Sequence, residues 1–182
     1  VEGAMFLKTA KLSSYSEQQL VDCAGSTGNM GCNGGLMDNA FQWIINNGGI
    51  NTEAAYPYTA QDGQCKSALA KQHAVSISKF TDVPRMNEDA LMQAVSQQPV
   101  SIAIEADQSA FQFYSGGVMD GTCGTALDHG VLLVGYGTDS GKDYWKVKNS
   151  WGAQWGEEGY IRLIRGQNQC GLANAASYPK TK

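Results

Sequence analysis

Apolar and polar positions alternate with helical spacing in the first half of the chain. Residues 1–12 have a broad apolar face, residues 36–46 place their apolar side chains on one face, and residues 16–23 open with a helix-start signal, which together predict three helices. The second helix follows the capping-box sequence Ser16-Glu17-Gln18-Gln19. A further helix is expected after Asn87, before Pro99 ends it, whereas residues 51–76 carry little regular pattern.

The second half has short apolar runs that are typical of strands. The expected strands are Val100–Ile104, His129–Tyr136, Asp143–Lys148 and Gly159–Arg165. Helices followed by strands predict an α+β protein with two lobes. We expect residues 1–78 to form a helical lobe and residues 79–182 to form a strand-rich lobe that includes the C-terminal tail.

Composition and charge exclude several classes of protein. The 182 residues are 42% hydrophobic and carry a net charge of −4. This is enough apolar material for a core, and the charge is opposite to that of a general nucleic-acid binder. The apolar runs are far too short to span a bilayer, so neither a nucleic acid nor a membrane is expected as a partner.

The five cysteines favour disulfides over a metal site. They are Cys23, Cys32, Cys65, Cys123 and Cys170. No pair has the close spacing of zinc ligands, and the chain has only two histidines, so no metal is expected. Wide spacings fit disulfides formed in an oxidising compartment. One cysteine must remain unpaired within the chain, either as a buried free thiol or with a partner outside these residues.

His129 and Asn149 stand at the ends of neighbouring predicted strands. Each residue taken singly is most often structural. Antiparallel pairing of the two strands would bring them together, so that the Asn oxygen accepts a hydrogen bond from one ring nitrogen of His129. That bond fixes the tautomer and directs the other nitrogen at a nucleophile. Trp151 and Trp155 follow closely in the sequence and would shield the bond from water.

Several further motifs occur in the same order as in one known family. They are Tyr15-Ser16-Glu17-Gln18-Gln19-Leu20-Val21-Asp22-Cys23, Gly31-Cys32-Asn33-Gly34-Gly35-Leu36-Met37-Asp38, Tyr56-Pro57-Tyr58, Leu127-Asp128-His129-Gly130, Val134-Gly135-Tyr136-Gly137, Lys148-Asn149-Ser150-Trp151-Gly152, Trp155-Gly156-Glu157-Glu158-Gly159-Tyr160 and Cys170-Gly171-Leu172. Over essentially its whole length the chain resembles the papain-family cysteine peptidases, close to the cathepsin L-like group. The resemblance implies a helical lobe and a β-barrel-like lobe with a cleft between them, and a Cys thiolate that attacks a peptide carbonyl. It implies that His129 is the general acid–base residue and that Asn149 orients its ring. Trp151 would screen the hydrogen bond between them and help to form the wall of the cleft on the prime side of the scissile bond.

The chain departs from the family at the nucleophile. The segment Cys-Gly-Ser-Cys-Trp is absent, and family spacing places its catalytic Cys about 0–20 residues before Val1. The resemblance pairs Cys23 with Cys65 and Cys123 with Cys170, and leaves Cys32 without the partner that the missing segment would supply. We therefore expect an N-terminally truncated chain that is inactive alone. Loss of the preceding helix half should also expose the apolar faces of Phe6, Phe41 and Ile44.

The resemblance also maps the substrate-binding residues. Gly34 and Gly35 leave backbone groups free to pair with an extended peptide, although the same glycines also suit a simple tight turn. The pocket for the second residue before the scissile bond maps onto Leu36, Met37, Ala103, Leu127 and Ala175, and the substrate-binding set also includes Asp128 and Trp151. All five pocket residues are apolar, which predicts a preference for bulky apolar groups over Arg. No terminus-holding insertion is evident, so an endopeptidase is favoured.

Two alternatives stay open at this point. One is a non-catalytic homologue that binds peptides or proteins through the cleft, and the other is a disulfide-stabilised binding module without peptidase ancestry. The sequence preceding Val1 would separate a peptidase from a non-catalytic homologue. For a peptidase we expect a monomer without cofactor, acting in a lysosome, vacuole or outside the cell. Its partners would be peptide and protein substrates, cystatin-like inhibitors and its own pro-segment.

Overall fold

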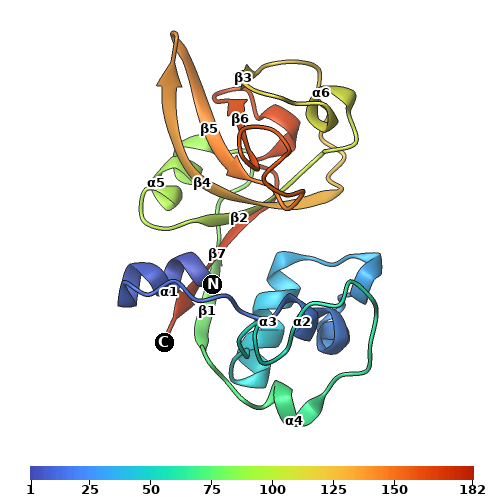
Figure 1. Cartoon of the computed structure of the whole chain (residues 1–182). Helices are drawn as coiled ribbons and strands as arrows, with labels where there is room; N and C mark the ends of the chain where they lie inside the picture. The colour runs from blue at the N-terminus through green and yellow to red at the C-terminus, as the bar shows by residue number, and fades with distance from the viewer. The chain divides into compact units, whose positions relative to one another are not determined.

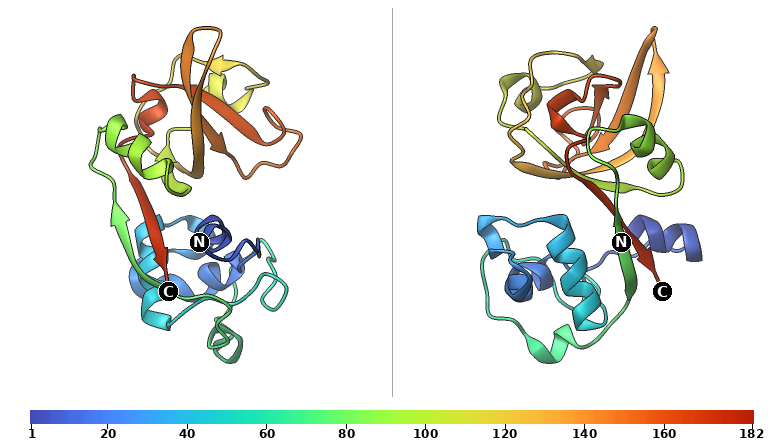
Figure 2. Two further views of the ribbon diagram at one scale, coloured as in Figure 1. Left: turned by 90° about the vertical axis from the view of Figure 1, so that its left-hand side faces the viewer. Right: turned by 180° about the vertical axis from the view of Figure 1, so that it is seen from behind.

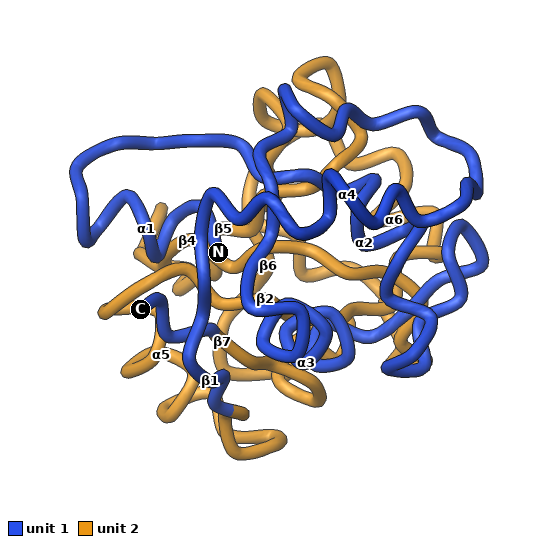
Figure 3. Tube along the Cα trace, turned by 90° about the horizontal axis from the view of Figure 1, so that it is seen from below, with its two compact units in different colours: residues 1–81, 179–182 blue, residues 82–178 orange.

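The structure is a computed structural model that describes residues 1–182. The chain divides into two compact units, which are coloured separately in Figure 3. Unit 1 comprises Val1–Thr81 and Pro179–Lys182, and unit 2 comprises Asp82–Tyr178. The predicted lobes divided the chain at residue 78 and assigned the C-terminal tail to the second lobe, whereas residues 179–182 are part of unit 1.

Unit 1 contains four α-helices, together with short 3₁₀ helices at Ala24–Thr27 and Gly31–Asn33. The α-helices are α1 (Glu2–Thr9), α2 (Glu17–Cys23), α3 (Met37–Asn47) and α4 (Ser67–Ala70) (Figure 1). The capping box forms at α2, where the Ser16 side chain accepts a hydrogen bond from the Gln19 amide at 2.9 Å. α1 ends earlier than expected because Ala10 adopts a left-handed conformation with φ 56°. α4 lies within the segment where no regular structure was expected.

The core of unit 1 gathers on the inner face of α3. Phe41, Trp43 and Ile44 pack in one cluster with Tyr15, Ala24, Ile50, Val75 and Ile77. Phe6 is 46% exposed, but Phe41 and Ile44 are only 6% and 2% exposed. The expectation that Phe41 and Ile44 would be uncovered is therefore wrong, because segments of the same unit bury them.

The strands form a single seven-stranded sheet. They are β1 (Ile77–Asp82), β2 (Val100–Ile104), β3 (Val118–Met119), β4 (His129–Asp139), β5 (Lys142–Lys148), β6 (Tyr160–Ile164) and β7 (Ala176–Thr181), in the order β1-β7-β2-β4-β5-β6-β3. Figure 2 shows β1 and β7 side by side. The four predicted strands are present within a few residues of their expected ends, whereas β1, β3 and β7 were not predicted.

Unit 2 adds two short helices to this sheet. α5 (Glu88–Val95) begins at Asn87, whose side chain accepts from the Ala90 amide at 2.8 Å, and α6 (Ser109–Gln112) was not expected. The core of the unit combines apolar residues of α5 with the inward side chains of β2, β4, β5 and β6, among them the fully buried Trp145 and Leu133. No helix of the chain is long and apolar enough to cross a bilayer.

The hairpin of β4 and β5 positions the residues of interest. Its turn uses Ser140 and Gly141 with φ 51° and 78°, the left-handed pair that fits the twist of two-residue hairpins. From this turn the antiparallel register runs back to Leu132 opposite Lys148. The first residue of β4 and the residue that follows β5 therefore lie at the same end of the hairpin.

Candidate active site

His129 and Asn149 meet at that end of the hairpin. His129 opens β4 and is paired with Ile104 of β2, while the Asn149 amide donates to the Gly159 carbonyl at 3.0 Å. Both backbones are thus fixed by hydrogen bonds. The side chains lie in contact, with His129 Nε2 2.8 Å from Asn149 Oδ1.

A second hydrogen bond defines the orientation of the Asn149 amide. The Ser150 backbone N–H donates to Asn149 Oδ1 at 2.8 Å, which requires an oxygen at that position. His129 Nε2 must then carry the proton in the His129–Asn149 bond. Nδ1 is consequently the ring nitrogen that remains for a reacting group.

The Asn149 side chain is buried with its donor group unpaired. The residue is 7% exposed, and its buried Nδ2 has no hydrogen-bond partner. An unpaired buried donor costs about 1–3 kcal/mol. Asn149 is therefore a poor choice for stability alone, which is typical of a residue retained for function.

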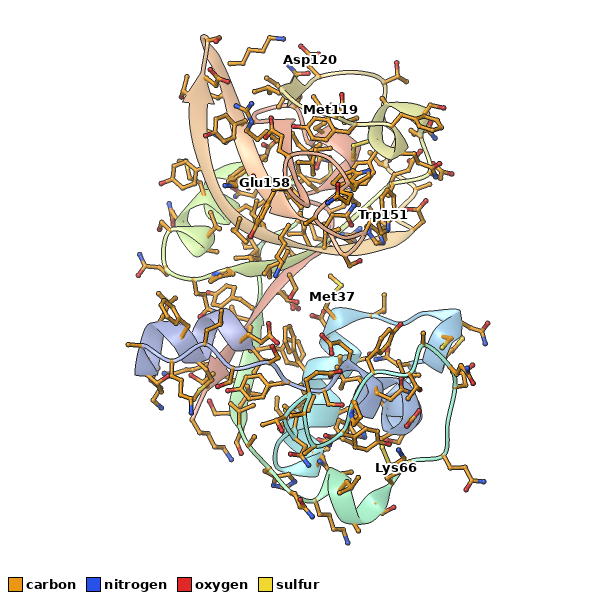
Figure 4. All side chains as sticks on the ribbon, viewed as in Figure 1. Met37, Lys66, Met119, Asp120, Trp151 and Glu158 are labelled. Atoms are coloured by element: carbon orange, nitrogen blue, oxygen red, sulfur yellow. A yellow bond between two sulfur atoms is a disulfide. The ribbon has the colours of Figure 1, made fainter.

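Aromatic rings cover one side of this pair. The Trp151 ring lies 5.2 Å from the His129 ring between centroids, and Trp155 and Phe111 meet Trp151 edge-on at 5.3 and 5.5 Å. Trp151, labelled in Figure 4, is 41% exposed, whereas Phe111 is fully buried. The sequence predicted the two tryptophans as a shield but missed Phe111, the one aromatic residue of the short helix α6.

The other predicted site residues of unit 2 lie on β2, directly before β7 and in the segment before β4. The Ala103 amide donates to the Ala175 carbonyl at 3.0 Å, so these two small residues adjoin. Leu127 is half-buried, and Asp128 precedes His129. The Asp128 carboxylate accepts from the Ala106 amide at 2.7 Å, so it is engaged in holding the backbone.

The predicted residues of unit 1 lie on one turn that leads into α3. Gly34, Gly35 and Leu36 are exposed, and Met37 is the first residue of the helix. Gly34 has φ 107°, a conformation that only glycine adopts without strain, and its carbonyl accepts from the Met30 amide. Because the Gly34 carbonyl takes part in a hydrogen bond of the turn, the glycines form a tight turn as the simpler interpretation predicted.

Four of the five cysteines are oxidised. Cys23 is bonded to Cys65 and Cys123 to Cys170, and Cys32 is free and exposed. Desolvation and the neighbouring Asp62 carboxylate raise the pKa of the Cys32 thiol. A reactive cysteine requires the opposite shift. The 182 residues thus contain an oriented imidazole but no activated thiol.

Comparison with known proteins adds independent information. The family model described as "Papain family cysteine protease" matches residues 1–180. "Probable cysteine protease RD21B" of Arabidopsis thaliana is 55% identical over 186 residues, covering 100% of this chain and 40% of the relative. "Vignain" of Ricinus communis is 57% identical over 187 residues, covering 100% of this chain and 52% of the relative. The chain thus spans about half or less of the length of these curated relatives.

Solved structures agree with the fold. The bromelain protease from Ananas comosus, solved in complex with the E64 inhibitor, matches with a TM-score of 0.93 and 45% identity over 100% of this chain and 85% of that chain. The proform of the Amb a 11 cysteine protease, a ragweed pollen allergen, matches with a TM-score of 0.94 and 46% identity over 100% of this chain and 56% of that chain.

Proposed function

We propose that this chain, which belongs to the papain family of cysteine proteases, supplies the acid–base centre of a cysteine endopeptidase. The observation that carries the proposal is the 2.8 Å contact of His129 Nε2 with Asn149 Oδ1, whose orientation the Ser150 amide defines. An imidazole held in one tautomer is suited to general acid–base catalysis, which depends on a positioned side chain. Family membership supplies the reaction to which this centre belongs.

In the proposed reaction a cysteine thiolate attacks the carbonyl carbon of a peptide bond. An S–C bond forms, the C–N bond breaks, and the proton on His129 Nδ1 passes to the departing amine. Water then attacks the thioester, with His129 accepting its proton, and the thiol and a carboxylic acid are released. Asn149 keeps the imidazole aligned through both steps, and the nearby aromatic rings limit the access of bulk water.

The nucleophile is proposed to come from outside these 182 residues. Cys23, Cys65, Cys123 and Cys170 are disulfide-bonded, and Cys32 has a raised thiol pKa. By family resemblance the thiol belongs to a Cys-Gly-Ser-Cys-Trp segment, whose first cysteine would also pair with Cys32. The 182-residue chain alone should accordingly hydrolyse no peptide.

The proposed substrates are peptides with a bulky apolar residue two positions before the scissile bond. The residues of unit 2 assigned to that pocket, Ala103, Leu127 and Ala175, carry no charge, and those of unit 1, Leu36 and Met37, are also apolar. Burial of a Leu or Phe side chain against such residues is worth about 1.5–3 kcal/mol. An Arg at this position would find no carboxylate among them.

We further propose that the enzyme acts in an oxidising or acidic compartment, such as a vacuole or lysosome, or outside the cell. Two disulfides support this assignment, because disulfides persist where thiols are not kept reduced. A pro-segment and cystatin-like inhibitors are the expected protein partners. The proform of Amb a 11 and the E64 complex of bromelain are precedents among similar proteins.

The test compares the 182-residue chain with a completed chain, in which a family segment carrying Cys-Gly-Ser-Cys-Trp precedes Val1. Fluorogenic peptide amides with Phe, Leu or Arg at the second position are the substrates. We expect no hydrolysis by the 182-residue chain and hydrolysis by the completed chain, faster with Phe or Leu than with Arg.

Three results would count against parts of the proposal. Hydrolysis by the 182-residue chain would contradict the external nucleophile, and a dominant Arg preference would contradict the assigned pocket. A folded completed chain that binds peptides without cleaving them would favour the non-catalytic homologue.

A further inference from the structure

A buried carboxylate lies close to the candidate site without belonging to it. Glu105 follows β2 directly and is 5% exposed. Both of its carboxylate oxygens accept hydrogen bonds: Oε1 from Gln108 Nε2 at 2.7 Å, and Oε2 from the Ala126 backbone amide at 2.6 Å. A buried charged group is costly unless it is bonded in this way, so its presence calls for an explanation.

The segment that Glu105 binds is the one that leads into His129. Residues 122–128 have no regular secondary structure. Cys123 is tied to Cys170 by a disulfide, and the Glu105 amide donates to the Cys170 carbonyl at 2.9 Å. The Glu105 carboxylate holds Ala126, which is three residues before His129. The irregular segment is therefore linked to the short stretch after β2 at two points: through Cys170 at its start, and directly through Ala126 near its end.

The attachment continues up to the residue before His129. The Asp128 amide donates to the Ile104 carbonyl at 2.9 Å, and the Asp128 carboxylate accepts from the Ala106 amide at 2.7 Å. Glu105 and Asp128 thus reach across in opposite directions, each side chain binding the backbone of the other's segment. This reciprocal clamp defines where β4 begins, and hence where the His129 ring is placed against Asn149.

The packing around the carboxylate leaves it little freedom. A methyl group added at Gly124 would overlap both oxygens of Glu105. By contrast, a methyl group at Gly121 in the same loop would make an ordinary 3.4 Å contact with Ala110. The close approach at Gly124 encloses the carboxylate between backbone groups, as expected for a group whose position is specified.

We propose that Glu105 is a positioning residue for His129: its carboxylate fixes the 122–128 segment so that the imidazole enters β4 in register with Asn149. The catalytic part of this inference rests on the proposed function, whereas the geometric part does not. Glu105 touches no reacting atom and acts through Ala126 and the backbone that follows it. Leu127 lies between the two bonded residues, so the same clamp also places one wall of the assigned substrate pocket.

The test uses two pairs of matched substitutions. Glu105→Gln replaces one acceptor oxygen by an NH2 group. That NH2 group would face a donor, either the Ala126 amide or Gln108 Nε2. It could find an acceptor only if the Gln108 amide turned over and lost its hydrogen bond to Asp107. The control for this variant is Glu88→Gln, since Glu88 also accepts backbone amides of a loop, those of Gly166 and Asn168, within unit 2. The second pair is Gly124→Ala, which displaces the carboxylate sterically, with Gly121→Ala as its control.

The first readout is the nitrogen NMR spectrum of the His129 ring in the 182-residue chain. His73 is the only other histidine, so His73→Ala assigns the signals. We expect one Nε2–H tautomer in the wild-type chain, Glu88→Gln and Gly121→Ala. In Glu105→Gln and Gly124→Ala we expect a mixture of tautomers or the loss of the Nε2–H signal.

The second readout is kinetic and uses the completed chain. We expect kcat to fall about 10- to 100-fold in Glu105→Gln and Gly124→Ala, as misplacement of a catalytic group typically does, and less than 3-fold in both controls at matched thermal stability. Glu105→Asp, which retains two acceptor oxygens, should recover part of the loss. If Glu105→Gln does not fold, the comparison of Gly124→Ala with Gly121→Ala tests the positioning role of Glu105.

The outcomes separate this inference from the proposed function. Unchanged His129 signals in both Glu105→Gln and Gly124→Ala, or a loss of kcat equal to that of the controls, would reduce Glu105 to a structural residue and overturn the inference. A folded wild-type completed chain that shows the expected His129 tautomer but cleaves no peptide would overturn the proposed function and leave the positioning role in place.

Discussion

At the scale of single residues, the side-chain oxygen of Asn149 accepts two hydrogen bonds. It accepts from His129 Nε2 and from the Ser150 amide, both at 2.8 Å, while the amide nitrogen of the same side chain is buried without a partner. An aspartate would place a buried charge here, and an apolar residue would leave the imidazole unheld. The carboxamide therefore orients the ring without adding a charge to it.

Asn149→Ala should lower kcat/KM of the completed chain about 10- to 100-fold, because the imidazole loses the acceptor that fixes its tautomer and its position. Steady-state hydrolysis of a peptide amide measures this loss. Asn46→Ala removes an exposed carboxamide that accepts from Gln42, and should change kcat/KM less than 2-fold, about the scatter of such assays. Equal activity of wild type and Asn149→Ala would mean that the imidazole needs no orienting group.

At the scale of elements, the turn between β5 and β6 supports the same pair. It begins at Asn149, includes Trp151 and Trp155, and returns through Gly159, whose carbonyl accepts from the Asn149 amide. Gly156 has φ 58°, and a methyl group added there would lie 2.5 Å from the Tyr160 carbonyl oxygen. A side chain at this position would therefore strain the turn.

Gly156→Ala should destabilise the protein by about 1–3 kcal/mol through backbone strain, which lowers Tm by several degrees. Calorimetry of the folded chain measures the shift. Gly135→Ala is the matched control, since a methyl group at Gly135 meets no atom within 4 Å and its φ is not positive. If both variants melt at the same temperature, close packing at Gly156 does not constrain the turn.

A second feature of this element is the ion pair of Arg162 with Glu157. Both carboxylate oxygens of Glu157 accept from the guanidinium at 2.8 Å, and Asp139 accepts from it at 2.7 Å. The hydrogen bond to Arg162 is the main cause that lowers the pKa of Glu157 below its ordinary 4.5. A carboxyl group with a lowered pKa stabilises the fold at pH values above its ordinary pKa. This stabilisation is lost as the pH falls through the lowered pKa.

Arg162→Met should therefore cost stability at neutral pH, about 1 kcal/mol after allowance for solvent screening of a pair near the surface. The difference from wild type should shrink as the pH falls below 4.5 and Glu157 takes up a proton. Urea unfolding at a series of pH values measures it. Lys142→Met, which breaks an ion pair whose side chains are each about half exposed, should show a smaller difference. A pH-independent cost for Arg162→Met would assign its role to packing on the Tyr144 ring.

At the scale of the whole molecule, the proposed acid–base centre lies within one unit. His129, Asn149, the aromatic screen and the clamp of Glu105 with Asp128 all belong to unit 2. The residues assigned to substrate binding are divided between the two units, with Gly34 to Met37 in unit 1. Orientation of the imidazole can thus be tested without reference to unit 1.

The contact of His129 with Asn149 could be predicted from the sequence because neighbouring strands and a short hairpin determine it. The apolar runs of β4 and β5, together with the turn at Ser140-Gly141, place His129 and Asn149 at one end. The clamp could not be predicted, because the burial of Glu105 depends on Ala126, 21 residues away in an irregular segment. β7 was missed since its sequence, with Pro179 and Lys180, lacks an apolar pattern and pairs with distant strands. Phe41 and Ile44 stay covered because long-range partners of unit 1 enclose them.

The central claim is that His129 is the acid–base of a cysteine endopeptidase, and the most direct measurement is kcat/KM of the completed chain with each histidine removed in turn. Loss of a general acid–base typically costs about 10²- to 10⁴-fold, so His129→Ala should lose activity by this amount. His73→Ala should retain wild-type activity, because His73 lies in an exposed loop beside Asn47. Wild-type activity in His129→Ala, with the fold intact, would contradict the account.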